Sequence, residues 1–61
     1  MSEITYRNDT YKKFLFVKKI GNNIAEFYYR NYDGTDHPTR VERFDELINY
    51  ITNVEKWIPI E

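Results

Sequence analysis

Residues 11–32 read YKKFLFVKKIGNNIAEFYYRNY, and this stretch decides the fold. Its two arms, residues 11–20 and 24–32, are rich in Phe, Tyr, Val and Ile, the residue types that suit the pleated surface of a β-strand. Between them lies Gly21-Asn22-Asn23, whose residues tolerate the positive φ that a tight hairpin turn requires. The stretch therefore predicts two antiparallel strands joined by a three-residue loop.

The register of this hairpin can be judged from its charges. A three-residue loop pairs Ile20 with Ile24 and sets Lys18 opposite Glu26, whereas a shift by one residue would set Lys18 opposite an aromatic residue. The favourable pairing then assigns each side chain to a face, because side chains alternate along a strand. One face carries Leu15, Val17, Ala25, Phe27 and Tyr29. The other carries Phe14, Phe16, Ile20, Ile24, Tyr28 and Tyr32, bordered by Lys12, Lys18, Glu26 and Arg30.

A helix is predicted over residues 41–53, because apolar residues recur there at helical spacing. These positions are Val41, Phe44, Leu47, Ile48, Ile51 and Val54. Thr39 with Glu42 three residues later matches a capping box, in which each side chain accepts a hydrogen bond from a free backbone N–H. The first of the two faces described above is the one that suits the apolar stripe of this helix.

The remaining segments complete an α+β domain. Residues 3–7 predict a short edge strand, closed by the turn-forming Asn8-Asp9-Thr10, and residues 33–38 predict a polar loop. Residues 55–60 predict an extended tail or edge strand, since Pro59 cannot donate to a strand ladder. We therefore expect residues 1–61 to form a single domain. It is a small antiparallel sheet of about three strands packed against one C-terminal amphipathic helix, followed by an extended C-terminal tail.

Composition narrows the possible functions. The 61 residues include no cysteine and one histidine, so disulfides and thiolate metal sites are ruled out. Residues 1–31 carry a net charge of +3 and residues 32–61 a net charge of −4, so neither half has the charge density of a nucleic-acid footprint. The longest apolar run, residues 14–17, is too short to span a bilayer, and no signal peptide is visible. We expect a cytoplasmic protein with no membrane partner.

Two clusters are candidates for a metal site or an acid–base site, and both lie in the segment after the second strand of the hairpin. Asn31, Asp33, Thr35 and Glu42 fall at ligand positions of a calcium loop, but Asp36 occupies the position where that loop needs glycine. His37 lies beside Asp33 and Asp36, but nothing supplies a nucleophile, because Ser2 at the terminus is the only serine. The sequence therefore predicts no catalytic, cofactor or metal site, and we expect the protein not to be an enzyme.

The face of the hairpin opposite the helix is the predicted functional surface. A single helix covers one face of a small sheet, so the other face keeps its rings exposed, and an exposed apolar patch rimmed by charge is typical of an interaction site. The predicted partner-binding residues are Phe14, Phe16, Tyr28, Arg30 and Tyr32. The partner is another protein or, in a homodimer, a second copy of the chain, and self-association would help so short a chain to stay folded.

Two further considerations bear on the partner. Single-stranded nucleic acid is the alternative, because Lys12, Lys13, Lys18 and Lys19 alternate with rings that could stack on bases. Those lysines, however, divide between the two faces of the strand. The abundance of Ile, Asn, Lys and Tyr and the short length are typical of small proteins from phages and mobile elements of AT-rich bacteria. A phage-type inhibitor of a host protein is therefore one form of the protein-binding hypothesis.

Overall fold

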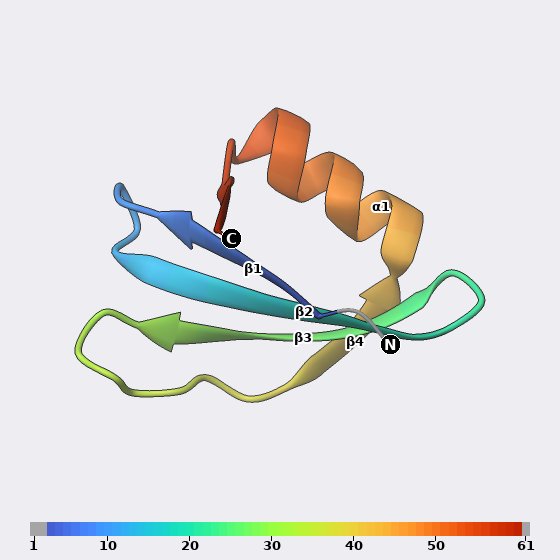
Figure 1. The fold of residues 1–61 in the computed structure, drawn as a ribbon, viewed down its shortest axis with the longest axis horizontal. Coiled ribbons are helices and arrows are strands. Elements are labelled where there is room, and N and C mark those ends of the chain that lie inside the picture. The colour runs from blue at the N-terminus through green and yellow to red at the C-terminus, as the bar shows by residue number, and fades with distance from the viewer. Residues whose placement is uncertain (1–2, 61) are drawn as a thin grey trace.

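A computed structural model describes residues 3–60 as an antiparallel sheet with one helical segment crossing one of its faces (Figure 1). The sheet has five strands in the order β4-β3-β2-β1-β5. The strands are β1 (Glu3–Asn8), β2 (Lys13–Gly21), β3 (Ile24–Asn31), β4 (Arg40–Arg43) and β5 (Ile58–Ile60). The helical segment consists of α1 (Phe44–Asn49), continued by the π-helical turn η1 (Tyr50–Val54). We call the sheet face under the helix the inner face and the opposite one the outer face.

The central hairpin of β2 and β3 has the register that its charges predict. Lys18 pairs with Glu26, and the pairing continues in step to the far end of both strands. The turn itself differs from the prediction, because Gly21 rather than Ile20 pairs with Ile24, and a bulge between Lys19 and Gly21 absorbs the extra residue. The loop is therefore two residues long rather than three.

The prediction of a helix over residues 41–53 is wrong at its N-terminal end. Residues 40–43 instead form β4, which pairs with β3 from Ile24 to Phe27. The apolar stripe holds only in its middle, where Leu47 and Ile51 are buried, while Val41 and Val54 are 61% and 60% exposed. Pairing supplies partners for backbone groups of β3 that a helix at this position would leave free, which is the physical reason that strand replaces helix here.

The start of α1 is determined by Asn23 in the hairpin turn, not by a capping box at Thr39. Asn23 has a φ of 61°, and its backbone oxygen accepts a hydrogen bond from the Phe44 N–H at 3.0 Å. Its side-chain Oδ1 accepts a second bond from the Asp45 N–H at 2.9 Å. These are two of the N–H groups that a helix leaves without an internal partner at its first turn. Asn23, which is distant in sequence, therefore caps the helix in place of the predicted Thr39.

The sheet also has more strands than the roughly three predicted. The N-terminal strand β1 is internal rather than an edge, because the chain returns after the helix and β5 pairs with it. The tail does form an edge strand, as its proline indicated, with Pro59 paired opposite Tyr6. Two short strands, β4 and β5, thus form the edges of the sheet, and short edges with charged residues or proline resist pairing with other chains.

The core lies between the inner face and the helical segment. Its buried hydrophobic residues are Tyr6, Leu15, Val17, Ala25, Phe27, Leu47, Ile51 and Trp57. The four that come from β2 and β3 belong to the face predicted to meet the helix. Trp57, from the segment between η1 and β5, is 5% exposed and belongs to this core. No helix in the described part of the chain is long and apolar enough to cross a membrane.

Candidate functional site

The outer face is built by the alternation of side chains along the strands. The hairpin register places Phe16 opposite Tyr28 and Phe14 opposite Arg30. From β1, Thr5 and the other odd-numbered residues face the same way, because Thr5 pairs with Phe16. The predicted rings of β2 and β3 therefore do share one face, on the side of the sheet away from the helix.

The rings on this face pair with each other across the strands. Phe16 and Tyr28 stack with their centroids 4.9 Å apart and their planes at 21°. Phe14 and Tyr32 lie with their centroids 4.9 Å apart at a tilt of 42°. Phe14, Phe16 and Tyr28 are consequently half-buried rather than left in water, whereas Tyr32 remains 42% exposed. Pairing within the sheet thus covers part of the ring area that the sequence alone would leave exposed.

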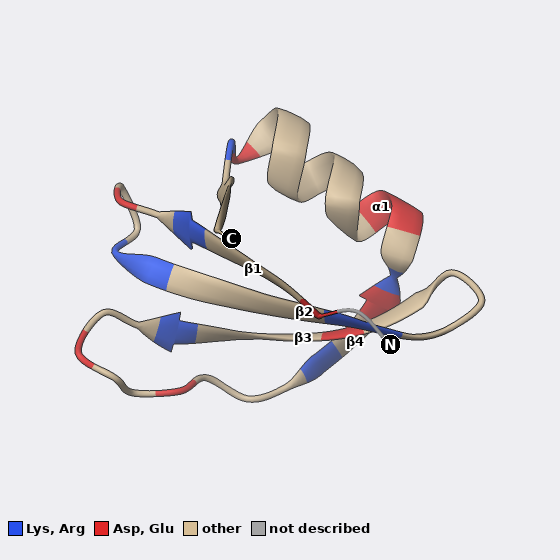
Figure 2. Ribbon diagram, viewed as in Figure 1, with Lys and Arg blue, Asp and Glu red and all other residues tan. Residues whose placement is uncertain are grey.

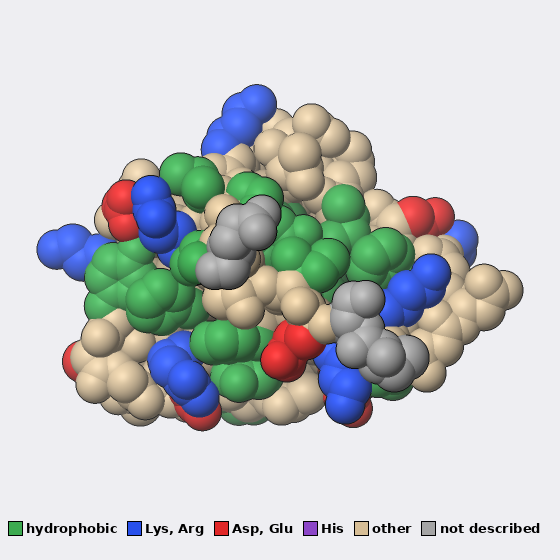
Figure 3. Space-filling model, viewed as in Figure 1, with side chains coloured by type: hydrophobic (Ala, Val, Ile, Leu, Met, Phe, Trp, Pro, Cys, Tyr) green, Lys and Arg blue, Asp and Glu red, His purple; other side chains and the backbone are tan. Residues whose placement is uncertain are grey.

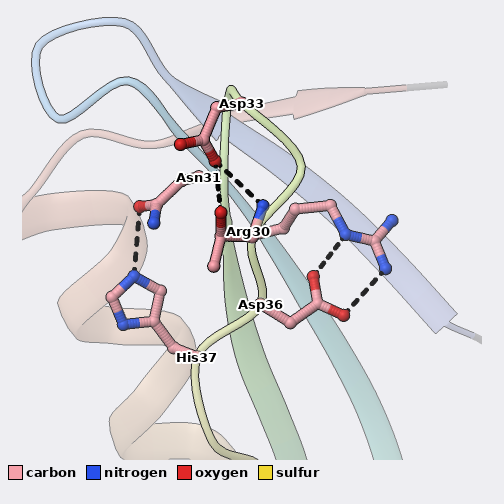
Figure 4. Close-up of polar contacts among 6 residues, drawn as sticks. Arg30, Asn31, Asp33, Asp36 and His37 are labelled. Atoms are coloured by element: carbon pink, nitrogen blue, oxygen red, sulfur yellow. Dashed lines mark hydrogen bonds and ion pairs between the residues drawn. The ribbon is translucent and has the colours of Figure 1, made fainter.

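Arg30 lies across the stacked rings. Its guanidinium carbon is 5.0 Å from the centroid of Phe16 and 5.8 Å from that of Tyr28, distances at which the charge is attracted to the ring faces. Asp36 holds the guanidinium by accepting hydrogen bonds at both carboxylate oxygens, as Figure 4 shows. This hydrogen bond lowers the pKa of Asp36 and raises that of Arg30. The loop that carries Asp36 therefore positions a cation over the stacked rings of the outer face.

A second polar contact ties the edge of the face to the β1–β2 turn. The Tyr32 hydroxyl donates a hydrogen bond to Asp9, and this bond raises the pKa of the tyrosine. Asp9 also lies 3.9 Å from the guanidinium of Arg7. Carboxylates from the two neighbouring loops, those of Asp9 and Asp36, thus accompany the arginines of the outer face.

Aliphatic side chains extend the apolar surface beyond the rings. The register places Ile24 on β3, Val41 on β4 and Ile58 on β5 on the outer face, with exposures of 39%, 61% and 47%. Figure 3 shows hydrophobic side chains reaching the surface in patches between Lys and Arg side chains. The candidate site is therefore an apolar surface with charges interspersed, running from one edge of the sheet to the other.

The lysines of β2 do not gather on this face. Lys18 lies on the outer face opposite Glu26, whereas Lys19 extends over the Phe44 ring, with its Nζ 5.0 Å from the centroid, on the inner face. Figure 2 shows basic residues on every strand except β5, and acidic residues on strands as well as in the loops and at the start of the helix. The predicted division of the lysines between the two faces is therefore present in the structure.

The loop weighed for calcium and for acid–base chemistry is held together by its own side chains. Asp33 accepts hydrogen bonds from the backbone N–H and the hydroxyl of Thr35, and His37 bonds Asn31 at 3.0 Å (Figure 4). The Thr35 bonds lower the pKa of Asp33. Within residues 3–60, no three His, Asp or Glu side chains come together in a way that could hold a metal ion.

Sequence reasoning missed the clamp of Arg30 by Asp36. The two residues are six positions apart, and nothing in the residue pattern signals that the loop folds back to bring them together.

Compared with protein-family models, curated protein sequences and solved structures, the chain gives no significant match. Function is therefore inferred from the residues of the outer face themselves.

Proposed function

We propose that the protein is a non-catalytic binding module that recognises another protein through its outer face. The observation that carries this proposal is the mismatch between the two faces of the sheet. The helical segment covers the inner face, while no layer among residues 3–60 covers the outer one, which nonetheless carries four aromatic rings and three exposed aliphatic side chains. Surfaces of this kind, apolar with a charged border, are typical of interaction sites.

The charges on the outer face favour a protein over a polyanion. Arg30 is bound by Asp36, and Arg7 lies near Asp9. A phosphate backbone would have to displace these carboxylates before the cations could bind it. Aromatic residues and arginine are enriched at protein–protein interfaces, where they often anchor the partner. Arg30 over its two rings has this composition.

The available surface is large enough for such a contact. A standard interface buries about 800 Å² of each partner, which is roughly a fifth of the 4365 Å² that this chain exposes. The outer face is one whole side of a five-stranded sheet. A partner that packs a second layer against it would complete a three-layer arrangement of helix, sheet and partner.

The partner is either a second copy of the chain or a different protein. An inhibitor of a host protein, of the kind encoded by phages and mobile elements, is the narrower form of the second possibility and rests on length and composition alone. The cytoplasmic location inferred from the sequence stays a prediction.

The test is the double substitution Phe16→Glu with Tyr28→Lys, which introduces opposite charges on a cross-strand pair. We expect the variant to keep a native-like circular dichroism spectrum and to lose association, measured by sedimentation for self-association and by capture from a lysate for another partner. The matched control is Val54→Glu with Asn53→Lys, which makes the same charge change on the exposed side of the helical segment. This control should associate as the wild type does.

The result that would contradict the proposal is specific. If the wild type is a monomer that captures no partner, and the Phe16→Glu/Tyr28→Lys variant unfolds, the paired rings serve only the stability of the domain. The outer face would then have no binding role.

Single-stranded nucleic acid remains the second candidate, because a sheet with aromatic rings and nearby lysines has the components of a base-stacking surface. The rings, however, stack on each other and lie under Arg30, so fewer ring faces are free for bases. Retention of the wild type on single-stranded DNA that falls steeply with salt, and that is lost in Lys18→Gln, would favour this candidate over a protein partner.

A further inference from the structure

The inner face holds a pocket that the outer-face proposal does not involve. The pocket has a volume of about 510 Å³, which lies within the range of small-molecule sites. Its lining residues come from the β1–β2 turn, from β2, β3 and β4, from the loop before β4 and from the segment after η1. The lining residues that matter for binding are Tyr11, Lys13, Tyr29, Arg40, Glu55 and Trp57.

Three aromatic rings form the walls of this pocket. The Trp57 ring centroid lies 5.6 Å from that of Tyr29 at 37° and 6.0 Å from that of Tyr11 at 54°. Tyr11 is 47% exposed and lies at the mouth of the pocket, whereas Trp57 is almost entirely buried and lies at its base. Such flat apolar walls suit a planar or apolar group of a ligand.

The single carboxylate of the pocket already has its hydrogen-bond donors. Glu55 Oε1 accepts a bond from the Trp57 indole N–H at 2.8 Å. Its Oε2 accepts bonds from the hydroxyls of Tyr11 and Tyr50, each at 3.3 Å. The negative charge of Glu55 also raises the pKa of both tyrosines. The carboxylate therefore serves to orient the walls, and its capacity to accept a hydrogen bond from a ligand is largely used.

The backbone around Glu55 supports this arrangement. The π-helical turn η1 ends with a bond from the Glu55 N–H to the Tyr50 oxygen at 3.0 Å, and such turns are frequent at functional sites. Lys56, which follows, has a φ of 59°, a conformation that costs an L-residue energy and is kept only where its surroundings enforce it. Together these features point Glu55 and Trp57 at the same pocket.

Unlike Glu55, whose oxygens already accept hydrogen bonds, the two cations of the pocket have no carboxylate partner within the described part of the chain. Among the described residues, neither Lys13 nor Arg40 lies within ion-pair distance of a carboxylate, whereas Arg7, Arg30 and Arg43 each do. A lysine ammonium offers three N–H donors and an arginine guanidinium five, with no acceptor in either. The pocket therefore offers two positively charged groups whose N–H donors are not used by a carboxylate.

We propose that this pocket binds a small anion that carries a planar ring, with the ring against Tyr11, Tyr29 and Trp57 and a carboxylate or phosphate group on Lys13 and Arg40. The ring supplies apolar contact, and the anionic group supplies acceptors for donors that the protein does not satisfy. Charge-assisted bonds of this kind are about twice as strong as neutral ones. The pocket lies on the other side of the sheet from the outer face, and the loop that holds Arg30 through Asp36 also lines the pocket through His37 and Pro38.

The test uses the fluorescence of Trp57, the only tryptophan in the chain. Titration with phenyl phosphate and with phenylacetate should each give a saturable change, and the tighter of the two identifies the preferred anionic group. Inorganic phosphate, which lacks the ring, and benzylamine, which has the ring with the opposite charge, should bind at least about tenfold more weakly. Binding of the anions should also weaken as salt is raised, because the cations are solvent-accessible.

A matched pair of variants then locates the anionic group. Arg40→Gln should weaken phenyl phosphate binding about tenfold, the usual effect of removing one charge-assisted hydrogen bond. Arg43→Gln, on the same strand but paired with Asp45 and Glu46, should leave it within about twofold of the wild type by the same arithmetic.

Three results would overturn the proposal. The first is that neither phenyl phosphate nor phenylacetate gives a saturable change in Trp57 fluorescence. The second is benzylamine binding as tightly as either anion, which would make the pocket a cation site. The third is an equal effect of the Arg40→Gln and Arg43→Gln substitutions. The first two use the wild-type protein alone, so they decide the matter even if a variant fails to fold.

Discussion

Replacing Asn23 should disrupt the hairpin turn and the start of the helix together. Its side chain and its backbone oxygen accept the bonds from Asp45 and Phe44 that begin α1, at 2.9 and 3.0 Å. Losing a side-chain cap costs about 1 kcal/mol. At a φ of 61°, alanine should lose a further 1 kcal/mol or so relative to asparagine, which tolerates this conformation better. We therefore expect Asn23→Ala to lower the free energy of unfolding by about 2 kcal/mol.

Two companion substitutions separate the two contributions. Asn23→Gly removes the side-chain cap but suits the positive φ, so it should cost only about 0.5 kcal/mol, clearly less than Asn23→Ala. Asn23→Asp keeps an acceptor and adds a negative charge at a helix N-terminus, so it should cost less than about 0.5 kcal/mol. Urea unfolding followed by circular dichroism measures each difference. For a domain of this size, 2 kcal/mol corresponds to a fall in melting temperature of roughly 8–16 °C.

Thr39→Ala is the control, and it decides between the two starting points for the helix. Thr39 is exposed and precedes β4, so its replacement should change stability by less than about 0.5 kcal/mol. A capping box at Thr39 would instead make it cost about 1 kcal/mol. If Thr39→Ala destabilises the protein as much as Asn23→Ala, or if Asn23→Ala is neutral, the assignment of the cap to Asn23 is wrong.

Three further predictions concern the core and the loop before β4. Leu47→Ala should cost about 2–5 kcal/mol in urea unfolding, because the side chain is 5% exposed in the core, and an unchanged midpoint would show that the core is wrongly assigned. Gly34→Ala should cost about 1 kcal/mol from backbone strain, since its φ is 98° although the space around it is open, and a stabilised variant would argue against this conformation. The bond from Arg30 lowers the pKa of Asp36 below its ordinary 3.8, so the stability that it contributes is complete above that pH and is lost as pH falls through the lowered value. Thermal unfolding of Asp36→Asn between about pH 2 and 6 should show a shallower acid decline than the wild type, and identical curves would count against the clamp.

The sequence predicted which residues form the candidate site, but not how much of their aromatic rings is exposed to solvent. Alternation along β2 and β3 is a local property, so the sequence was enough to assign Phe16, Tyr28 and Arg30 to one face. How much ring area remains in water depends on how the rings pair across the strands and on where the Arg30 guanidinium lies. That position depends on Asp36, which the turn over residues 31–35 brings back beside Arg30, and the residue pattern did not predict the geometry of this turn.

What the sequence by itself determined is the part of the fold governed by near neighbours. The β2–β3 register follows from residues that pair across one turn, such as Lys18 with Glu26, and Pro59 restricts the tail to an edge position. The middle of the helix, around Leu47 and Ile51, follows from apolar spacing. In each case the physical preference lies in residues close together in the chain.

Only the tertiary structure decided which segments pair at the sheet edges and where the helix begins. Residues 40–43 have the periodicity of a helix start and still form β4, because the free backbone groups of β3 gain hydrogen bonds from them. Asn23 caps a helix that begins 21 residues later, at Phe44, and β5 makes β1 an internal strand. Backbone hydrogen bonds between distant segments leave no periodic trace in the sequence, because every residue except proline can both donate and accept them.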